Sequence, residues 1–216
     1  LHKEYRRQRQ MCIRDSTSCS SENGAVICSQ VYTKAISALE AAGGLMLDAA
    51  DKKRLEDVMF HNGKLTSTLT AQSPAVIAER AQLQNPKAKS AKFFMVEEQG
   101  FGLSAPFSGE KLSPVLTIWK AADFEAAKQL IVDVYAYQGA GHSVGLHTAQ
   151  SGEILESRAA ALAQQLPVAR IIVNQAHAIA TGGSFENGLP FSLSMGCGTW
   201  GKNNFSENMN YRHYLN

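Results

Sequence analysis

The sequence predicts an α/β fold, with a mostly parallel sheet, flanking helices and a loop-rich C-terminal segment. Beyond Thr17, short β-like runs alternate with runs of helical spacing, which is typical of an α/β domain. Residues 115–173 predict a β-α-β-α-β succession, and such a succession builds parallel strands. With 216 residues, 44% of them hydrophobic and 19% charged, the chain can form one large domain or two small ones.

Apolar spacing and capping residues predict the elements of the first half. Strands are expected at 25–29, 93–96 and 115–119, and helices at 31–42, 49–60 and 73–81. Two glycines at 43 and 44 end the first helix. Asp48 suits the cap of the second helix, and Ser73 followed by Pro74 suits the start of the third.

The second half continues this alternation and then changes character. Helices are expected at 123–137 and 151–166, and strands at 144–148 and 170–173. Between the elements, 85–90 is expected to be a surface connection and 100–114 a loop. From Asn174 onward, Gly, Asn, Ser and aromatic residues follow no helical period, and loops of this length line a site or an interface.

The first 16 residues differ from the rest of the chain. They contain no apolar region followed by a small-residue cleavage site, so we expect no secretory signal. The string MCIRDS at 11–16 resembles a translated sequencing-adapter read-through, and we interpret 1–16 as a non-native leader. A native basic arm is the alternative interpretation.

Charge and hydropathy argue against two classes of partner. The net charge is +2, but residues 1–16 hold five basic and two acidic residues, which leaves 16 basic and 17 acidic residues in the body. That body shows no pattern typical of nucleic-acid binding or of polybasic membrane attachment. No run of 18 apolar residues occurs, so we expect no membrane partner.

Cysteine and histidine spacing predicts no metal site. The four cysteines fit neither a disulfide framework nor a CxxC metal site, so a reducing cytoplasm is the simpler location. His142 and His147 lie five residues apart, which does not place two imidazoles on one helical face. Cys28, inside an apolar run, and Cys197 are expected to be packing residues.

Two glycine-rich stretches resemble dinucleotide-binding fingerprints without their context. The sequence GCGTWG at 196–201 matches GxGxxG, but only 15 residues follow it and they do not predict the required helix. The sequence GAGHSVG at 139–145 misses the spacing by one residue and lies between a helix and a strand. We expect a tight αβ turn there, whose glycines permit a close approach that presses His142 against a ligand.

Cys19 is the most informative cysteine. It lies in a short polar segment, 18–24, that ends in glycine just before a strand. A thiol at such a strand end can be exposed near backbone amides, which stabilise a thiolate and later an oxyanion. The local sequence supports a reactive thiol and a structural thiol equally.

Five blocks in one order resemble the CoA-acylating aldehyde dehydrogenases, including the aldehyde half of bifunctional aldehyde-alcohol dehydrogenases. They are CSSEN at 19–23, EKLSP at 110–114, GAGH at 139–142, RIIVN at 170–174, and MGCGTWG at 195–201 with SEN at 206–208. NQAHAIATGGS at 174–184 and NYRHY at 210–214 most resemble the acylating sulfoacetaldehyde dehydrogenase type. In the family, a dinucleotide-binding half precedes the reactive cysteine, so the resemblance implies that this chain is a C-terminal fragment.

The resemblance also implies the chemistry and its residues. The fold is expected to be that of the aldehyde dehydrogenase catalytic domain, and Cys19 corresponds to the nucleophile that forms a thioester. The substrate is an aldehyde, NAD or NADP accepts the hydride, and coenzyme A takes the acyl group. Glu110 and Leu112 correspond to residues that contact the nicotinamide ribose and ring, and His142 to a residue near the thiol or the CoA.

The remaining expectations concern the C-terminal part and assembly. Thr199 and Trp200 are candidates to line the acyl pocket, with a core tryptophan as the equal alternative. We expect 17–173 to form the catalytic α/β domain, and 174–216 to line the site or the interface of a homo-oligomer. The family's side-chain partner in the oxyanion hole lies upstream of Cys19, so the chain alone is expected to be inactive.

Two other functions remain open from the residues. One is a nicotinamide-independent thiol acyltransferase or hydrolase that uses Cys19 with His142, which requires an imidazole within hydrogen-bond reach of the sulfur. The other is a non-catalytic module that associates with copies of itself or with a full-length enzyme.

Overall fold

The structure, a computed structural model, describes residues 21–139, 141–185, 187–192 and 194–215. The chain folds into two compact units that divide between Tyr137 and Gln138. The sequence predicts the division at 173/174 instead. The roles expected for residues 17–173 and 174–216 stay predictions.

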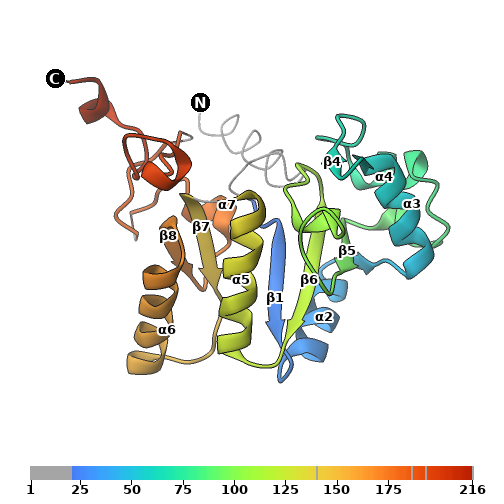
Figure 1. Ribbon diagram of the computed structural model, residues 1–216, viewed down its shortest axis with the longest axis horizontal. Coiled ribbons are helices and arrows are strands. Elements are labelled where there is room, and N and C mark those ends of the chain that lie inside the picture. The colour runs from blue at the N-terminus through green and yellow to red at the C-terminus, as the bar shows by residue number, and fades with distance from the viewer. Residues whose placement is uncertain (1–20, 140, 186, 193, 216) are drawn as a thin grey trace. The chain divides into compact units, whose positions relative to one another are not determined.

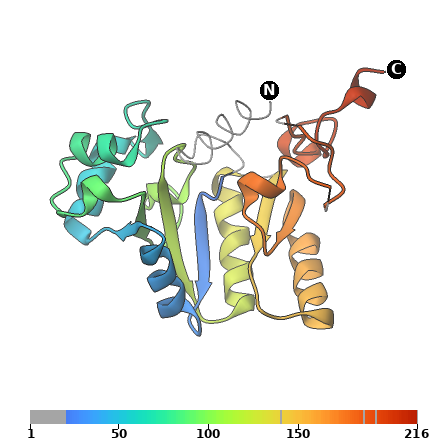
Figure 2. The same ribbon diagram turned by 180° about the vertical axis from the view of Figure 1, so that it is seen from behind.

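A four-stranded parallel sheet forms the centre of the first unit. Its order is β1-β6-β5-β2, and every neighbouring pair is parallel. The strands are β1 (Gly24–Cys28), β2 (Gly44–Met46), β5 (Phe93–Glu97) and β6 (Val115–Ala121). Helix α2 (Tyr32–Ala41) connects the two edge strands and lies along one face of the sheet (Figures 1 and 2). The predicted α/β class with a parallel sheet is confirmed.

The capping residues predicted from the sequence start the helices of this unit. The Asp48 side chain accepts a hydrogen bond from the Asp51 backbone N–H at 2.8 Å, and α3 (Ala49–Met59) follows. The Ser73 side chain accepts from the Val76 N–H at 3.5 Å at the start of α4 (Pro74–Arg80). Helix α5 (Phe124–Gln138) follows β6 and ends at the boundary between the units.

Three short strands were not expected from the sequence. β2 has three residues, and β3 (Phe60–His61) and β4 (Lys64–Leu65) form a hairpin of two residues each. Strands of two or three residues are too short to show the alternation of apolar and polar residues by which a strand is predicted. Pairing with a neighbouring strand defines them instead. The hairpin did have a local sequence signal, the Asn62-Gly63 pair, which favours a two-residue type I′ turn. In the structure both residues have the positive φ that this turn requires.

The main hydrophobic core of the first unit lies between α3, α4, the hairpin and the sheet, where α3 and α4 gather to one side of β5 (Figure 1). Phe60 and Phe107 meet edge to face in it, with ring centroids 5.1 Å apart. Asp51 is buried at its margin, and its carboxylate accepts from the N–H groups of Gln84 and Asn85 at 2.8 and 2.9 Å. These bonds fix the connection that leads from α4 toward β5.

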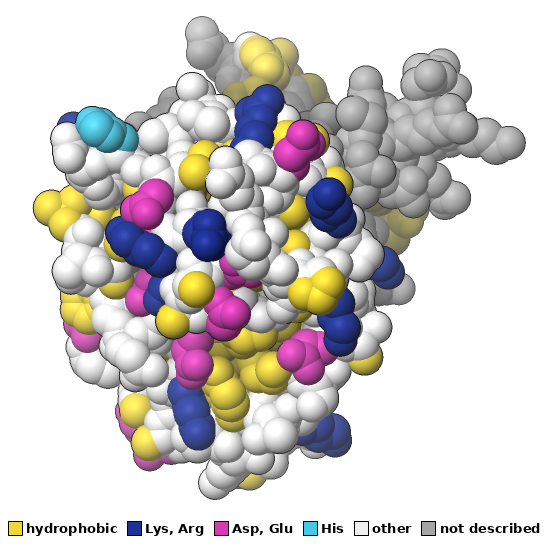
Figure 3. Space-filling view, turned by 90° about the vertical axis from the view of Figure 1, so that its right-hand side faces the viewer, with side chains coloured by type: hydrophobic (Ala, Val, Ile, Leu, Met, Phe, Trp, Pro, Cys, Tyr) yellow, Lys and Arg dark blue, Asp and Glu magenta, His cyan; other side chains and the backbone are white. Residues whose placement is uncertain are grey.

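Acidic and basic side chains are interspersed on the face of the first unit that carries α3 (Figure 3). Ion pairs account for part of this pattern, since Lys53 lies 2.9 Å from Glu56 and 2.8 Å from Asp57. Among the described residues, no helix is long and apolar enough to cross a membrane.

The second unit contains one parallel strand pair and its crossover helix. β7 (Gly141–Leu146) pairs with β8 (Val168–Val173), and α6 (Gly152–Gln165) connects them. The sequence predicts a tight turn within 139–145 and a strand from 144, but β7 already begins at Gly141. The reason is long-range, because the Gly141 N–H donates to the Pro167 carbonyl at 2.6 Å and Gly141 pairs with Val168.

The segment after β8 is rich in loops, with short helices. These are α7 (His177–Ala180) and the 3₁₀ helices η3 (Thr199–Gly201) and η4 (Tyr211–Tyr214). Met195 and Asn208 form an isolated antiparallel bridge, which closes the loop between them.

Candidate active site

The candidate nucleophile Cys19 lies outside the described residues. The nearest described residue whose side-chain contacts bear on the site is Asn23. The Asn23 side-chain amide donates to the Gly109 carbonyl at 2.9 Å, and its oxygen accepts from the Lys111 backbone N–H at 3.2 Å. These two bonds hold the peptides on either side of Glu110. The segment that follows Cys19 is thus tied to the loop that carries Glu110.

Glu110 and Leu112 lie between the 3₁₀ helix η2 (Pro106–Ser108) and strand β6. The Glu110 side chain is exposed, so its carboxylate can accept hydrogen bonds from the hydroxyl groups of a ligand. Leu112 is half-buried and has a φ of 46°, in the left-handed region. Its carbonyl accepts from the Ala71 N–H at 2.9 Å, which helps to hold that conformation.

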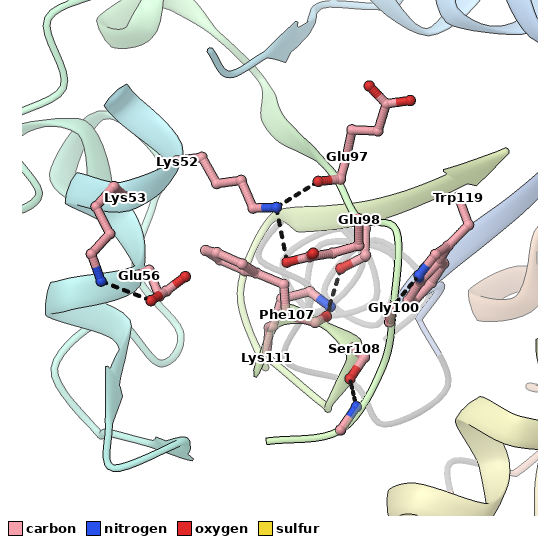
Figure 4. A network of polar contacts seen from close by, with 12 residues as sticks. Lys52, Lys53, Glu56, Glu97, Glu98, Gly100, Phe107, Ser108, Lys111 and Trp119 are labelled. Carbon is pink, nitrogen blue, oxygen red and sulfur yellow. Dashed lines mark hydrogen bonds and ion pairs between the residues drawn. The ribbon is translucent and has the colours of Figure 1, made fainter. Parts of the chain in front are cut away.

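Lys111, between these two residues, is fully buried. Its Nζ donates to the carbonyls of Phe107 and Gly109 at 2.8 and 3.1 Å, as Figure 4 shows for Phe107. Burial lowers the pKa of Lys111 to about 7, while the negative charges of Glu98 and Glu110 oppose this shift.

Lys52 and Glu98 complete this polar network (Figure 4). Glu98 is 8% exposed at the end of β5, and its carboxylate lies 3.0 Å from the Lys52 ammonium of α3. The same ammonium donates to the Glu97 carbonyl at 2.6 Å and lies 6.0 Å from the centroid of the Phe107 ring. Helix α3, the end of β5 and the η2 loop are therefore joined by one set of charged contacts.

In the second unit, His142 lies in β7 and is half-buried. Burial lowers the pKa of His142 below its usual 6.5, and the charges of Arg170 and His177 lower it further. The imidazole is therefore neutral at neutral pH and can accept a proton. His177 lies beside the same strand, with Nδ1 3.2 Å from the Ser143 hydroxyl.

Arg170 and Asn208 organise the loops around β8. The Arg170 guanidinium donates to the Gly196 carbonyl at 2.9 Å and to the Asn208 side-chain oxygen at 3.1 Å. Asn208 is fully buried and donates to the carbonyls of Thr181 and Pro190, both at 2.8 Å. Four loop segments are thereby fixed to one strand.

Gly141 brings the 196–201 loop close to β7. It has a φ of 101°, and a Cβ atom there would lie 2.6 Å from both the Cys197 carbonyl and the Gly201 nitrogen. Only glycine allows this approach. Thr199 and Trp200 lie in the same loop and are exposed, Trp200 by 52%, so the alternative of a core tryptophan is wrong.

Comparison with known proteins shows which enzymes the chain resembles. No family model matches the chain. The sulfoacetaldehyde dehydrogenase (acylating) of Cupriavidus necator is 54% identical over 202 residues, which make up 94% of this chain and 40% of that protein. The succinate-semialdehyde dehydrogenase (acetylating) of Clostridium kluyveri is 34% identical, over 92% of this chain and 42% of that protein. Over most of its own length, the chain is therefore similar to part of each of these two acylating dehydrogenases.

A solved structure with a similar fold supports this resemblance. The crystal structure of an acetylating aldehyde dehydrogenase from Geobacillus thermoglucosidasius has a TM-score of 0.82 and 28% identity, and the match covers 95% of this chain and 45% of that chain. The chain therefore spans less than half the length of these relatives. The predicted resemblance to acylating aldehyde dehydrogenases is confirmed.

Sequence reasoning found the acylating dehydrogenase motifs but missed the residues that support them. The structure brings Glu110 together with Asn23 and Lys111 in the first unit, and groups His142 with Arg170 in the second. Asn23 belongs to the quoted CSSEN block, but its partners lie 86 and 88 residues away. No local pattern marks contacts at that distance, and a lysine in a polar loop does not predict burial.

Lys111 predicts a folding stability that rises with pH between about 7 and 10. Unfolded lysine keeps its proton up to its usual pKa of 10.5, whereas folded Lys111 releases it near pH 7. In this window the unfolded state binds more protons, so the free energy of unfolding grows by up to about 1.4 kcal/mol per pH unit. Above pH 10 the trend reverses, because burial raises the pKa of Tyr32 and Tyr135 to about 12.

Urea unfolding of the chain at about pH 7, 8 and 9 checks this prediction. The rise should be absent from Lys111→Met and present in Lys53→Met, which removes an exposed lysine of α3. A parent chain with constant stability over this window would contradict it.

Proposed function

We propose that this chain is the cysteine-bearing part of an NAD(P)-dependent acylating aldehyde dehydrogenase, which converts an aldehyde to an acyl-CoA through a thioester on Cys19. The observation that carries the proposal is the pair of hydrogen bonds from Asn23 to the two peptides that flank Glu110. Cys19 precedes Asn23 by four residues, a chain span of at most about 14 Å. The bonds therefore support a site that combines the thiol with the Glu110 loop.

In the proposed reaction, the Cys19 thiolate adds to the carbonyl carbon of the aldehyde and forms a thiohemiacetal. The carbon then loses its hydrogen as hydride and the hydroxyl loses its proton, which leaves a thioester on the sulfur. The sulfur of CoA attacks this thioester and releases the Cys19 thiolate with the acyl-CoA product. A lowered thiol pKa is needed, since a free cysteine is only a few per cent ionised at pH 7.

The exposed Glu110 carboxylate fits the hydroxyl groups of a nicotinamide ribose, and half-buried Leu112 fits contact with the ring. NAD(P)⁺ supplies the hydride acceptor when bound. We assign to neutral His142 the role of accepting the thiol proton of CoA, and to exposed Thr199 and Trp200 a place along the acyl pocket. Homo-oligomeric assembly of the whole enzyme and a cytoplasmic location remain predictions.

Sulfoacetaldehyde is the substrate we propose. It is supported by the 54% identity to the Cupriavidus necator protein, which exceeds the 34% identity to the succinate-semialdehyde enzyme. The NQAHAIATGGS and NYRHY blocks of the C-terminal segment support the same subtype.

A chimera tests the proposal. Residues 17–216 replace the matching 40% of the Cupriavidus necator enzyme, and NAD(P)⁺ reduction is followed with sulfoacetaldehyde and CoA. We expect sustained reduction and acyl-CoA formation by the chimera, and none by the 216-residue chain alone. A folded chimera that forms no acyl-CoA would contradict the proposal, as would dinucleotide reduction by the chain alone. Acyl transfer between thioesters without any dinucleotide requirement would instead favour a thiol acyltransferase.

A further inference from the structure

We propose that Asn23 and Lys111 are positioning residues, which clamp the backbone on both sides of Glu110 and hold its carboxylate where it meets the nicotinamide ribose. The inference rests on the proposed function, in which Glu110 makes that contact. Neither residue needs to touch the cofactor itself.

Asn23 bridges the two sides of Glu110. Its backbone carbonyl accepts from the Thr117 N–H of β6 at 3.2 Å, which anchors the residue to the sheet. Its side chain then bonds Gly109 and Lys111, the residues before and after Glu110. A single amide thus sets the spacing and orientation of the two peptides that carry Glu110.

Lys111 reinforces the side of the clamp before Glu110. Its Nζ donates to the Gly109 carbonyl, which also accepts from Asn23, so this carbonyl is held by two donors. The same Nζ donates to the Phe107 carbonyl, which accepts from the Thr117 hydroxyl at 2.6 Å as well. The turn before Glu110 is therefore held at both ends, at the Phe107 and Gly109 carbonyls. The donors are the side chains of Asn23, Lys111 and Thr117.

Packing alone does not explain this arrangement. Burial of an amino group costs free energy that a methionine of similar length would avoid at the same position. The Glu110 side chain is exposed, so the clamp does not serve to bury it. What the contacts do is restrict the backbone of 109–111 just before Leu112, which holds a left-handed φ of 46°. A loop restricted in this way presents its carboxylate in one place before a ligand arrives.

The chimera described above carries the test, with Asn23→Ala and Lys111→Met as variants and Lys53→Met as the matched control. We expect either clamp variant to raise the KM for NAD(P)⁺ about tenfold, as for the loss of one hydrogen bond that positions a binding group. The KM values for CoA and aldehyde should stay within about twofold of the parent, and Lys53→Met should leave all three unchanged. The double variant should raise the KM by less than the product of the single effects, because both residues hold the Gly109 carbonyl.

Hydrogen exchange supplies a readout that does not need turnover. The Lys111 N–H donates to Asn23, so its exchange should accelerate at least about tenfold in Asn23→Ala and stay unchanged in Lys53→Met. Should Lys111→Met not fold, the KM for NAD(P)⁺ is measured on Asn23→Ala alone, because Asn23 is only half-buried.

The outcomes separate this inference from the function on which it rests. A folded parent chimera without turnover contradicts the proposed function, and the assigned role of the clamp falls with it. An active parent whose clamp variants keep the parent KM for NAD(P)⁺ overturns the clamp alone. An equal loss of kcat/KM for all three substrates also overturns it, because that pattern reports a general folding defect.

Discussion

Replacement of Cys19 by alanine should abolish CoA-dependent aldehyde oxidation by the chimera, with a loss of at least about 10³ in kcat. The reason is that both half-reactions pass through this sulfur, first as nucleophile toward the aldehyde and then as leaving group toward CoA. Steady-state NAD(P)⁺ reduction with aldehyde and CoA measures the effect.

Cys28→Ala is the matched control. Cys28 is a half-buried residue of β1 and is paired in register with Ala121 of β6, and it has no role in the proposed chemistry. This variant should keep the parent rate. If Cys19→Ala retained activity within about tenfold of the parent while Cys28→Ala lost it, the assignment of the nucleophile would be wrong.

Replacement of His142 by asparagine should slow acyl transfer to CoA by about 10², the lower range for loss of a general base. Burial and the charge of Arg170 hold the pKa of His142 below 6.5, so the imidazole is neutral and able to accept a proton at neutral pH. The parent rate should therefore fall as the pH drops through this lowered pKa. The variant should lack that dependence.

Single-turnover kinetics separate this effect from the oxidation step. The acyl-enzyme is formed first with aldehyde and NAD(P)⁺, and CoA is then added. His147→Asn is the control, because His147 is exposed just after β7. Acyl transfer that is equally fast in the parent and in His142→Asn would remove His142 from the site.

Local sequence information predicted most of the fold. Helix starts at Asp48 and Ser73 follow from side chains that cap their own helices, and such caps depend on neighbours three residues away. The position of β7 did not follow, because its start at Gly141 depends on pairing with Val168 across α6. Long-range pairing of this kind leaves no local period to read.

The candidate site divides in the same way. Cys19 and Glu110 are recognisable because each lies in a motif that resembles a family. The clamp is not, because it depends on Asn23 meeting a loop more than 80 residues away and on the burial of Lys111. The structure also buries Glu98 beside Lys52, and neither residue was singled out from the sequence.

The central claim is that Cys19 holds an acyl group. Mass spectrometry of the chimera after reaction with sulfoacetaldehyde and NAD(P)⁺, without CoA, tests it most directly. Peptide fragmentation should place the acyl adduct on Cys19, and later addition of CoA should remove it as acyl-CoA. An adduct on Cys28 or Cys197 instead, or no adduct on an enzyme that still turns over, would contradict the account.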